Sequence, residues 1–350
     1  MAKMIVLSNW YSMAFIWTLV KCSKHERLVR LAIQICIRGN TDRPMHATIS
    51  LIKSRLNLCF LAVLILLLVS LSAVADTIYV NQSAPVGTNN GSSWNNAYLE
   101  LQEALYVAKA GDEIWVATGI YTPAPGGTDR EATFQLINSV SIFGGFSGTE
   151  TGRDDRNLDP SNNGSILSGD LLQNDDSSPD SQQDNSYHVV TGTGTDNSAI
   201  LDGLTIMAGH AVETLNGKDW GGGLLFQGSG AAQIKNCLFK ENSAEYGGGV
   251  YNWAANSTFT RCTFLENTAF DGGGILIAEA SPVFEQCQFL RNETENDGSA
   301  ATITSGGLAR FTDCTFTANK ASSGTVSIEN SSDPIFVNCL TSVSSFPFLS

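Results

Sequence analysis

The sequence predicts an all-β solenoid, in which the chain coils so that short strands stack in parallel, with a short capping helix at the N-terminal end. Three observations support this prediction. Five cysteines recur at spacings of 25, 25, 27 and 25 residues, phenylalanine and asparagine follow them at fixed distances, and glycine clusters recur between them. A repeat of this length is typical of a solenoid, because each repeat contributes one coil of a continuous core.

The composition agrees with a secreted, turn-rich β protein. Of the 350 residues only 15% are charged and 33 are Gly, and 20 Lys+Arg stand against 34 Asp+Glu, for a formal net charge of -14. Nucleic acids and anionic membrane surfaces select basic proteins, so an acidic chain is a poor partner for either. We therefore expect no nucleic-acid partner.

An apolar run at 58–69 has the features of a secretory leader. Basic residues precede it, and a small-residue cleavage site that ends at Ala75 follows it. We expect a signal peptide over 45–75 that starts at Met45, which leaves a chain without a membrane span, secreted or held at the outer cell surface. An uncleaved anchor is the alternative, although the run is short for a membrane span.

Residues 1–44 precede this leader, and we interpret them as a spurious extension of the gene start. A second apolar segment over 4–20 is the competing interpretation. Nine of the 20 basic and two of the 34 acidic residues lie in 1–75. The remaining chain therefore has 11 basic and 32 acidic residues and a net charge of -21.

Residues 76–198 are expected to form the cap and the first, irregular coils. A strand at 77–80 is followed by an amphipathic segment at 97–110, where Leu101, Leu105 and Ala108 share one face of a helix. This helix is the candidate cap, since a solenoid must shield its first coil from water. Further strands are expected at 112–117, 134–137, 140–144, 166–168 and 187–191.

Residues 199–341 carry the regular repeat. Its three columns are the cysteines Cys237, Cys262, Cys287, Cys314 and Cys339, the phenylalanines Phe239, Phe264, Phe289 and Phe316, and the asparagines Asn242, Asn267, Asn292 and Asn319. Cys-x-Phe places both side chains on one face of a strand. Coils stacked about 4.8 Å apart then turn each column into a ladder of like side chains.

Each column has a physical interpretation. Asn tolerates the left-handed conformation of a sharp turn, and its amide can bond to the Asn of the next coil. The cysteines are expected to be buried free thiols, because parallel neighbours do not offer the short, converging Cβ geometry of a disulfide. Disulfides, which secretion favours, are the alternative. The glycine clusters permit tight bends or close approach between coils.

The repeat resembles those of right-handed parallel β-helix proteins of the pectin-lyase-like superfamily. Within that group, G-G-x-[ILV] at Gly221–Leu224, Gly247–Val250 and Gly272–Ile275 resembles the repeats of bacterial polymorphic outer-membrane proteins, as does F-x-x-N in the phenylalanine and asparagine columns. The resemblance covers 199–340 well and 76–198 more loosely. The final residues, 342–350, lack the pattern, and we expect an uncapped tail of a truncated chain.

The resemblance implies where chemistry would lie if the protein is an enzyme. Related β-helix enzymes cleave acidic polysaccharides with carboxylates, often with calcium, and a basic residue on an exposed sheet. In the outward and turn columns only Arg261, Glu285 and Asp313 form a charged trio, and a scattered solvated face is the alternative interpretation. The two histidines after residue 75, His188 and His210, show no nucleophile partner in the sequence.

Two other groups are candidate binding residues. Asp170, Asp175, Asp176 and Asp180 lie in one acidic loop whose oxygens can bind calcium, the sole cofactor considered, or remain a solvated loop. Trp220, Tyr251 and Trp253 are aromatic residues expected near one outer sheet, where they can stack on sugar rings or a protein partner, or be covered by a loop.

The favoured function is a secreted or cell-surface, non-catalytic solenoid for adhesion, with an extracellular polysaccharide or a surface protein as its partner. A polysaccharide lyase or glycoside hydrolase of the same fold is the alternative, and a fragment without an independent role is the third possibility.

Overall fold

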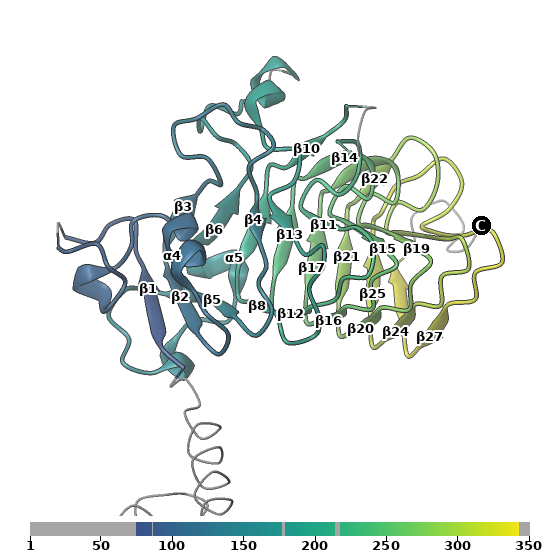
Figure 1. Ribbon diagram of the computed structural model, residues 1–350. Coiled ribbons are helices and arrows are strands. Elements are labelled where there is room, and N and C mark those ends of the chain that lie inside the picture. Colours follow the sequence, from purple (N-terminus) through teal and green to yellow (C-terminus); the bar gives the residue numbers. More distant parts are fainter. Residues whose placement is uncertain (1–74, 86, 177–178, 214–217, 343–350) are drawn as a thin grey trace, which may run out of the picture. The chain divides into compact units, whose positions relative to one another are not determined.

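The computed structural model describes residues 75–85, 87–176, 179–213 and 218–342, and the statements below concern these residues. They belong to one compact unit that begins at Ala75. Short parallel strands stack into four sheets along this unit (Figure 1), which confirms the predicted all-β solenoid. The predicted extension, the leader up to residue 74 and the tail after Ser342 lie outside the described residues.

The four sheets are named A to D. Sheet A contains β1 (Thr77–Val80), β2 (Glu113–Ala117), β5 (Ser141–Phe146), β8 (Ile200–Asp202), β12 (Gln233–Lys235), β16 (Thr258–Thr260), β20 (Val283–Glu285), β24 (Arg310–Thr312) and β27 (Ile335–Val337). Sheet B contains β3 (Gly119–Tyr121), β6 (Ser165–Ser168), β9 (Thr205–Met207), β13 (Leu238–Lys240), β17 (Thr263–Leu265), β21 (Gln288–Leu290), β25 (Thr315–Thr317) and β28 (Leu340–Ser342).

Sheets C and D complete each coil. Sheet C contains β4 (Phe134–Gln135), β7 (Val190–Thr191), β11 (Leu224–Phe226), β15 (Val250–Trp253), β19 (Ile275–Ala278), β23 (Ala301–Thr304) and β26 (Val326–Ile328). Sheet D, which begins only in the regular half, contains β10 (His210–Ala211), β14 (Ser243–Tyr246), β18 (Thr268–Asp271) and β22 (Glu293–Thr294). A regular coil therefore visits sheets A, B, D and C in that order.

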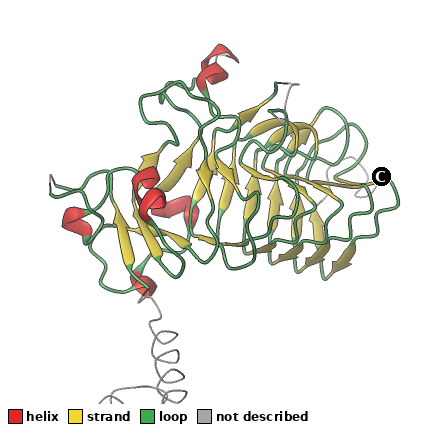
Figure 2. Ribbon diagram, viewed as in Figure 1, coloured by secondary structure: helices red, strands yellow, loops and turns green. Residues whose placement is uncertain are grey.

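The helices are short and lie away from the regular stack (Figure 2). They are η1 (Trp94–Asn96), α4 (Leu101–Val107), η2 (Arg153–Asp155), α5 (Pro160–Asn163) and η3 (Pro179–Asp184). None of the helices in the described part of the chain is long and apolar enough to cross a membrane.

Helix α4 caps the first coil, as predicted, but it is shorter than the predicted segment. Its residues Leu101, Ala104 and Leu105 are buried in the main core. The helix does not start at residue 97, because Tyr98 is tied to β1 by two backbone hydrogen bonds, from Asn81 N and to Tyr79 O. It ends before Ala108, whose backbone is extended.

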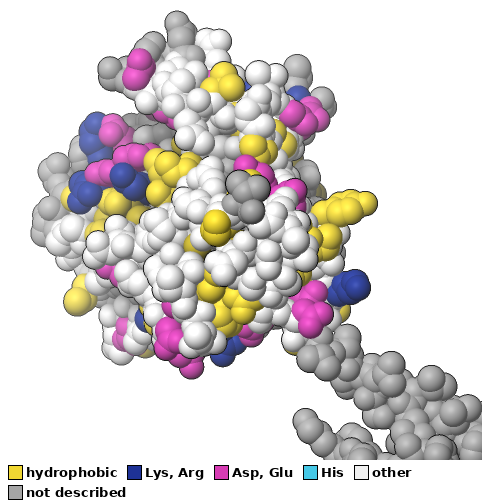
Figure 3. Space-filling view, turned by 90° about the vertical axis from the view of Figure 1, so that its left-hand side faces the viewer, with side chains coloured by type: hydrophobic (Ala, Val, Ile, Leu, Met, Phe, Trp, Pro, Cys, Tyr) yellow, Lys and Arg dark blue, Asp and Glu magenta, His cyan; other side chains and the backbone are white. Residues whose placement is uncertain are grey.

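The irregular half is less strand-rich than the sequence predicts. The strands expected at 134–137 and 187–191 shrink to two-residue strands, Phe134–Gln135 and Val190–Thr191. The other expected strands are present, and β3 was not predicted. Figure 3 shows the N-terminal end, where hydrophobic side chains lie in separate patches among polar ones.

Each turn of the regular coil uses a residue in the left-handed region. Directly before the cysteines these are Asn236, Arg261, Gln286, Asp313 and Asn338, with φ between 48 and 56°. A second set lies directly before the ladder asparagines, at Glu241, Glu266, Arg291 and Ala318. The prediction that the ladder asparagines themselves adopt this conformation is therefore wrong. The preceding residue turns the chain, which aims the Asn side chain into the interior.

The asparagines form a continuous amide ladder, as predicted. Asn242 Nδ2 donates to Asn267 Oδ1 at 3.0 Å, and Asn267 Nδ2 donates to Asn292 Oδ1 at 2.9 Å. Each Oδ1 also accepts a backbone N–H, from Gly209 for Asn242 and from the previous Asn for the others, and each Nδ2 also donates to a backbone carbonyl such as Phe239 O. The buried amides are thereby satisfied, which removes the cost of burying them.

Two phenylalanine ladders fill the interior beside it. Phe239, Phe264, Phe289 and Phe316 stack with ring centroids 4.5 to 5.2 Å apart. The apolar residues three before each cysteine form the second ladder, in which Phe259, Phe284, Phe311 and Phe336 stack at 4.6 to 4.9 Å. The ring spacing matches the spacing of the coils, so the backbone register and the aromatic stacking stabilise each other.

The five cysteines are free thiols, four of them buried and Cys339 partly exposed. Each sulfur contacts a carbonyl of the preceding coil, as Cys287 Sγ does with Phe259 O at 3.4 Å. Burial raises the pKa of the Cys237 and Cys287 thiols well above the ordinary value. Both therefore remain protonated and pack as small apolar groups.

The glycine clusters serve both predicted purposes. Gly247 has a φ of 71°, in the left-handed region, and turns the chain between sheets D and C. A Cβ on Gly249 would lie 2.5 Å from Gly274 O in the next coil, so no side chain fits there.

We expect Asn267→Ala to lower the free energy of unfolding by about 3 kcal/mol, since it removes amide bonds on both sides and leaves buried groups unpaired. Chemical denaturation measures the change. Asn197→Ala, at an exposed loop position, is the control and should cost less than about 0.5 kcal/mol. Equal losses in both variants would contradict the ladder's role.

Gln286 and Gln288 offer a matched pair for the turn conformation, since both are exposed but only Gln286 has a positive φ, 56°. We expect Gln286→Gly to be stabilising or neutral, because glycine relieves the left-handed strain of about 1 kcal/mol. Gln288→Gly, within β21, should destabilise by about 1 kcal/mol. Thermal melting of the two variants checks this, and the same sign for both would refute it.

Candidate functional site

The charged trio predicted from the sequence is dispersed along the edge between sheets A and B. Arg261 and Asp313 occupy left-handed turn positions two coils apart, and Glu285 ends β20 between them. All three side chains are exposed, and no ion pair joins them within the described residues. The structure does not bring them into one catalytic arrangement.

Arg261 instead ends a polar chain that crosses three coils. Its Nε donates to Asn236 Oδ1 at 2.8 Å, and Asn236 Nδ2 donates to Asp202 Oδ1 at 2.6 Å. Asp202 in turn pairs with Arg156, at 2.9 Å, with both side chains almost fully buried. These contacts hold the loop before α5 against sheet A, so Arg261 acts there as a structural residue.

The acidic loop uses its carboxylates to shape itself. Both oxygens of Asp170 accept backbone N–H groups, from Asn174 and Asp175 at 3.1 Å. Asp175 accepts a bond from Asn185 Nδ2 at 2.9 Å, and burial raises the pKa of its carboxyl, with Asp170 adding to the effect. The side chain of Asp180 lies outside the described residues, and Asp176 lies in the same turn.

The predicted calcium site therefore stays a prediction. Where side chains are described, no three His, Cys, Asp or Glu residues are grouped so as to hold a metal ion.

The three aromatic residues come together, and we call Trp220, Tyr251 and Trp253 the aromatic shelf. Trp220 stacks on Tyr251 with ring centroids 5.1 Å apart and an interplanar angle of 10°. It meets Trp253 edge-on, at 6.4 Å. All three side chains are partly buried. Trp220 comes from a loop and covers Tyr251, which agrees in part with the alternative that a loop covers these aromatic residues. Trp220 and Trp253 retain exposed surface.

The repeat explains how the shelf forms. Tyr251 and Trp253 point outward from β15, because the inward positions of this strand are Val250 and Asn252. Trp220 comes from the loop before β11 and forms an isolated parallel bridge with Tyr246 of sheet D. The chain then turns at Gly221, with φ of 62°, directly beneath Tyr251. The shelf thus lies at the turn from sheet D to sheet C.

Carboxylates lie around the shelf. Asp219 precedes Trp220, and Glu279 follows Ala278, which pairs with Trp253 in the next coil. Burial raises the pKa of the Tyr251 hydroxyl to about 12, and the charges of Asp219 and Glu279 add to this shift. Tyr251 is therefore neutral at physiological pH and acts as an uncharged stacking surface.

A second cluster, of Tyr187 with charged side chains beside β10, was not predicted from the sequence. Tyr187 is held between two cations, Arg130 at 4.2 Å and Lys218 at 4.8 Å from its ring centre. Arg130 also pairs with Glu213, at 2.7 Å, and Lys218 with Glu131, at 2.7 Å. These residues come from three irregular loops, so no repeat or motif in the sequence could indicate that they meet.

His210 does have a hydroxyl partner, contrary to the prediction from sequence. Its Nδ1 lies 2.6 Å from Ser243 Oγ, on the neighbouring strand of sheet D. The Ser243 hydroxyl also lies 3.5 Å from Gly209 O. Burial lowers the pKa of His210. Among the described residues no carboxylate hydrogen-bonds to the ring, so the pair lacks the third group of a catalytic triad.

His188 lies beneath the aromatic shelf. Its Nδ1 is 3.1 Å from Gly221 O, at the turn that carries Trp220. Burial lowers the pKa of this imidazole, outweighing the opposing contacts with the Gly221 and Trp220 backbone. The ring is therefore neutral at pH 7 and helps to hold the Trp220 turn.

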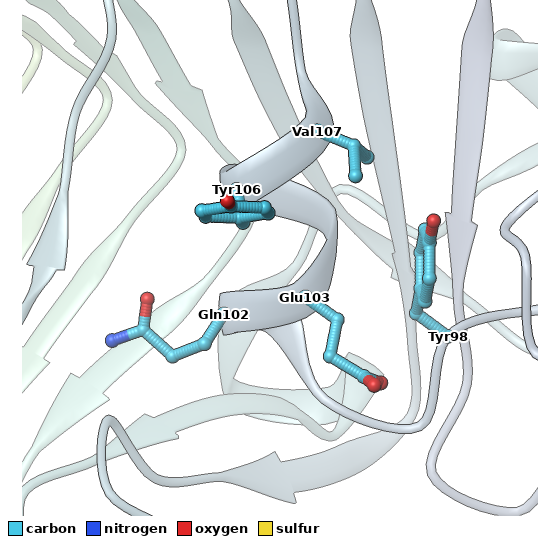
Figure 4. Close-up of a pocket in the computed structure, with 5 residues that line it drawn as sticks. All are labelled: Tyr98, Gln102, Glu103, Tyr106 and Val107. Carbon is cyan, nitrogen blue, oxygen red and sulfur yellow. The ribbon is translucent and has the colours of Figure 1, made fainter.

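A shallow hollow of about 400 Å³ lies over helix α4. Figure 4 shows Tyr98 and Glu103 on one side of the helix and Tyr106 and Gln102 on the other. Tyr106 is 91% exposed, but Gln102 is engaged with two backbone carbonyls, Pro123 O and Thr133 O. None of the candidate catalytic, metal-binding or ligand-binding residues predicted from the sequence lines this hollow.

The architecture matches that of known proteins. A family model described as a right-handed β-helix region matches residues 195–341. These residues form a right-handed β-helix. No curated protein matches the sequence.

Several solved structures are similar to this chain at low sequence identity. A pectin methylesterase from Aspergillus niger is 14% identical, over 80% of this chain and 91% of that chain, with a TM-score of 0.40. A pectate lyase is also 14% identical, over 78% of each chain, with a TM-score of 0.41. A pectin methylesterase from Yersinia enterocolitica is 10% identical, over 72% and 93%, with a TM-score of 0.36. The likeness concerns the fold alone.

The buried His188 predicts a pH dependence of stability. The unfolded chain takes up a proton near pH 6.5, whereas the folded state resists it, so the stability present above this pH is lost as the pH falls. We expect His188 to contribute a decline of at most about 1.4 kcal/mol per pH unit below pH 6.5, in addition to any contribution from His210. Denaturation at several pH values should show a shallower decline for His188→Gln. Identical slopes in both proteins would contradict this assignment.

Proposed function

We propose that this chain is a secreted or cell-surface β-solenoid that binds a glycan through the aromatic shelf, without chemical conversion. The observation that carries the proposal is the grouping of Trp220, Tyr251 and Trp253 on the outer side of sheet C. Aromatic faces that keep exposed surface on a rigid sheet suit the apolar faces of sugar rings.

Two further features support this proposal. The stacked ladders beneath the shelf, including the amide bonds between Asn242 and Asn267, hold the strand that carries Tyr251 and Trp253 in a fixed position. A preorganised surface loses little conformational freedom on binding. The G-G-x-[ILV] and F-x-x-N repeats resemble those of polymorphic outer-membrane proteins. The leader predicted at 45–75 would export the chain out of the cytoplasm, as a cell-surface role requires.

The shelf can be tested by substitution. We expect Trp253→Ala to weaken binding to β-linked hexasaccharides by about threefold to tenfold, the equivalent of one aromatic contact. Calorimetry or tryptophan fluorescence measures the affinity. Tyr106→Ala, which removes an exposed aromatic side chain from helix α4, is the control and should bind like the original protein.

Two outcomes would overturn the proposal. Equal binding by the original protein and Trp253→Ala would exclude the shelf as the contact surface. Release of unsaturated or reducing sugars, lost in Glu285→Gln or Arg261→Ala, would favour the lyase or hydrolase function instead.

A further inference from the structure

The aromatic shelf is bordered by carboxylates that form no ion pair with any residue the structure describes. Asp219 precedes Trp220 in the chain and accepts the Tyr246 N–H at its backbone oxygen, at 2.9 Å. Asp271 pairs in register with Tyr246, and Glu279 follows the residue that pairs with Trp253. Asp219 and Glu279 therefore lie close enough to act on Tyr251 of the shelf, and Asp271 lies one coil further along, beside Tyr246.

Some other acids of the regular coils are paired with a cation, whereas these three are not. Arg291 pairs with Glu266 at 2.8 Å, and Lys320 pairs with Glu293. Within the described residues no Lys, Arg or His forms an ion pair with Asp219, Asp271 or Glu279. The nearby Lys218 is engaged by Glu131 and by the Tyr187 ring. The shelf thus carries an uncompensated negative potential.

Asp219 adds a specific acceptor. Its Oδ1 is buried and has no hydrogen-bond partner. A buried acceptor without a donor is unfavourable by about 1–3 kcal/mol, and a cation bound nearby would offset part of this cost through its charge. The site therefore lacks a positive charge, which an ammonium group supplies.

We infer that the ligand of the aromatic shelf is a glycan that carries amino groups, a glucosamine-type polymer rather than a uronate polymer. This inference rests on the proposed function and names the class of its ligand. An ammonium group beside the indole faces gains cation–π attraction as well as the carboxylate charges. A uronate at the same place would bring like charge to three unpaired acids, which disfavours it.

Three hexasaccharides of one length separate the possibilities: a glucosamine hexamer, cellohexaose as the uncharged comparison, and a galacturonate hexamer. Binding is measured by calorimetry with the full chain, in mildly acidic buffer at physiological salt, after circular dichroism shows that the fold is intact. We expect the glucosamine hexamer to bind at least about tenfold more tightly than cellohexaose, and the galacturonate hexamer more weakly than both.

Variants distinguish the shelf from the general acidity of the protein. Glu279→Gln should reduce the preference for glucosamine over cellohexaose by about threefold or more. Asp333→Asn, which removes the same charge from an exposed acid in the loop before β27, is the matched control and should leave the preference unchanged. Equal effects of the two variants would mean non-specific attraction and would overturn the inference.

The remaining outcomes separate this inference from the proposed function. If cellohexaose or the galacturonate hexamer binds as tightly as the glucosamine hexamer and Trp253→Ala weakens that binding, the shelf binds glycans but the amino-group inference is wrong. If no hexasaccharide binds, or if Trp253→Ala changes nothing, the proposed function itself fails.

Discussion

The regular half of the described structure depends on one constraint, the in-register stacking of parallel coils about 4.8 Å apart. Whatever occupies one position meets its own equivalent in the next coil, so a buried residue must be compatible with a copy of itself. Phe satisfies this condition, because flat rings stack at 4.5 to 5.2 Å. Asn satisfies it because one amide both donates and accepts, as Asn267 does between Asn242 and Asn292. A buried carboxylate would face only like charge.

The same constraint explains which part of the fold could be predicted. The ladders are visible in the sequence, because a column that must fit itself keeps its residue type, as the cysteines do from Cys237 onward. The left-handed turns are not visible, because their side chains point away from the stack and vary freely. Arg261, Gln286 and Asp313 share one backbone conformation without sharing chemistry. The charges of Arg261 and Asp313, taken with Glu285, suggested a catalytic group, whereas the turn geometry accounts for the positions of Arg261 and Asp313.

The irregular half follows different rules. Its two-residue strands and long loops repeat nothing, so a contact such as that between Arg130 and Tyr187 has no periodic signal. In the regular half, His210 and Ser243 also lack a sequence signal, since they are 33 residues apart and joined only because β10 and β14 are neighbours. Sequence reasoning identified the cap because amphipathicity is local. The helix is shorter than predicted because Tyr98 is held by the edge of β1, and such a tertiary contact cannot be seen in the local sequence.

A specific site in such a stack must arise where the repeat is broken, since an unbroken column yields a surface that is the same in every coil. The aromatic shelf meets this condition. The positions equivalent to Trp220 in the next two coils are Tyr246 and Asp271, and the position that pairs with Trp253 is Ala278. The aromatic surface is therefore confined to the first regular coils, at the turn from sheet D to sheet C, and Asp271 takes its place on the sheet D side. Under the proposed glycan-binding function, this change within a few coils suits a short segment of a chain-like ligand, bound on the rings and oriented by the carboxylates beside them.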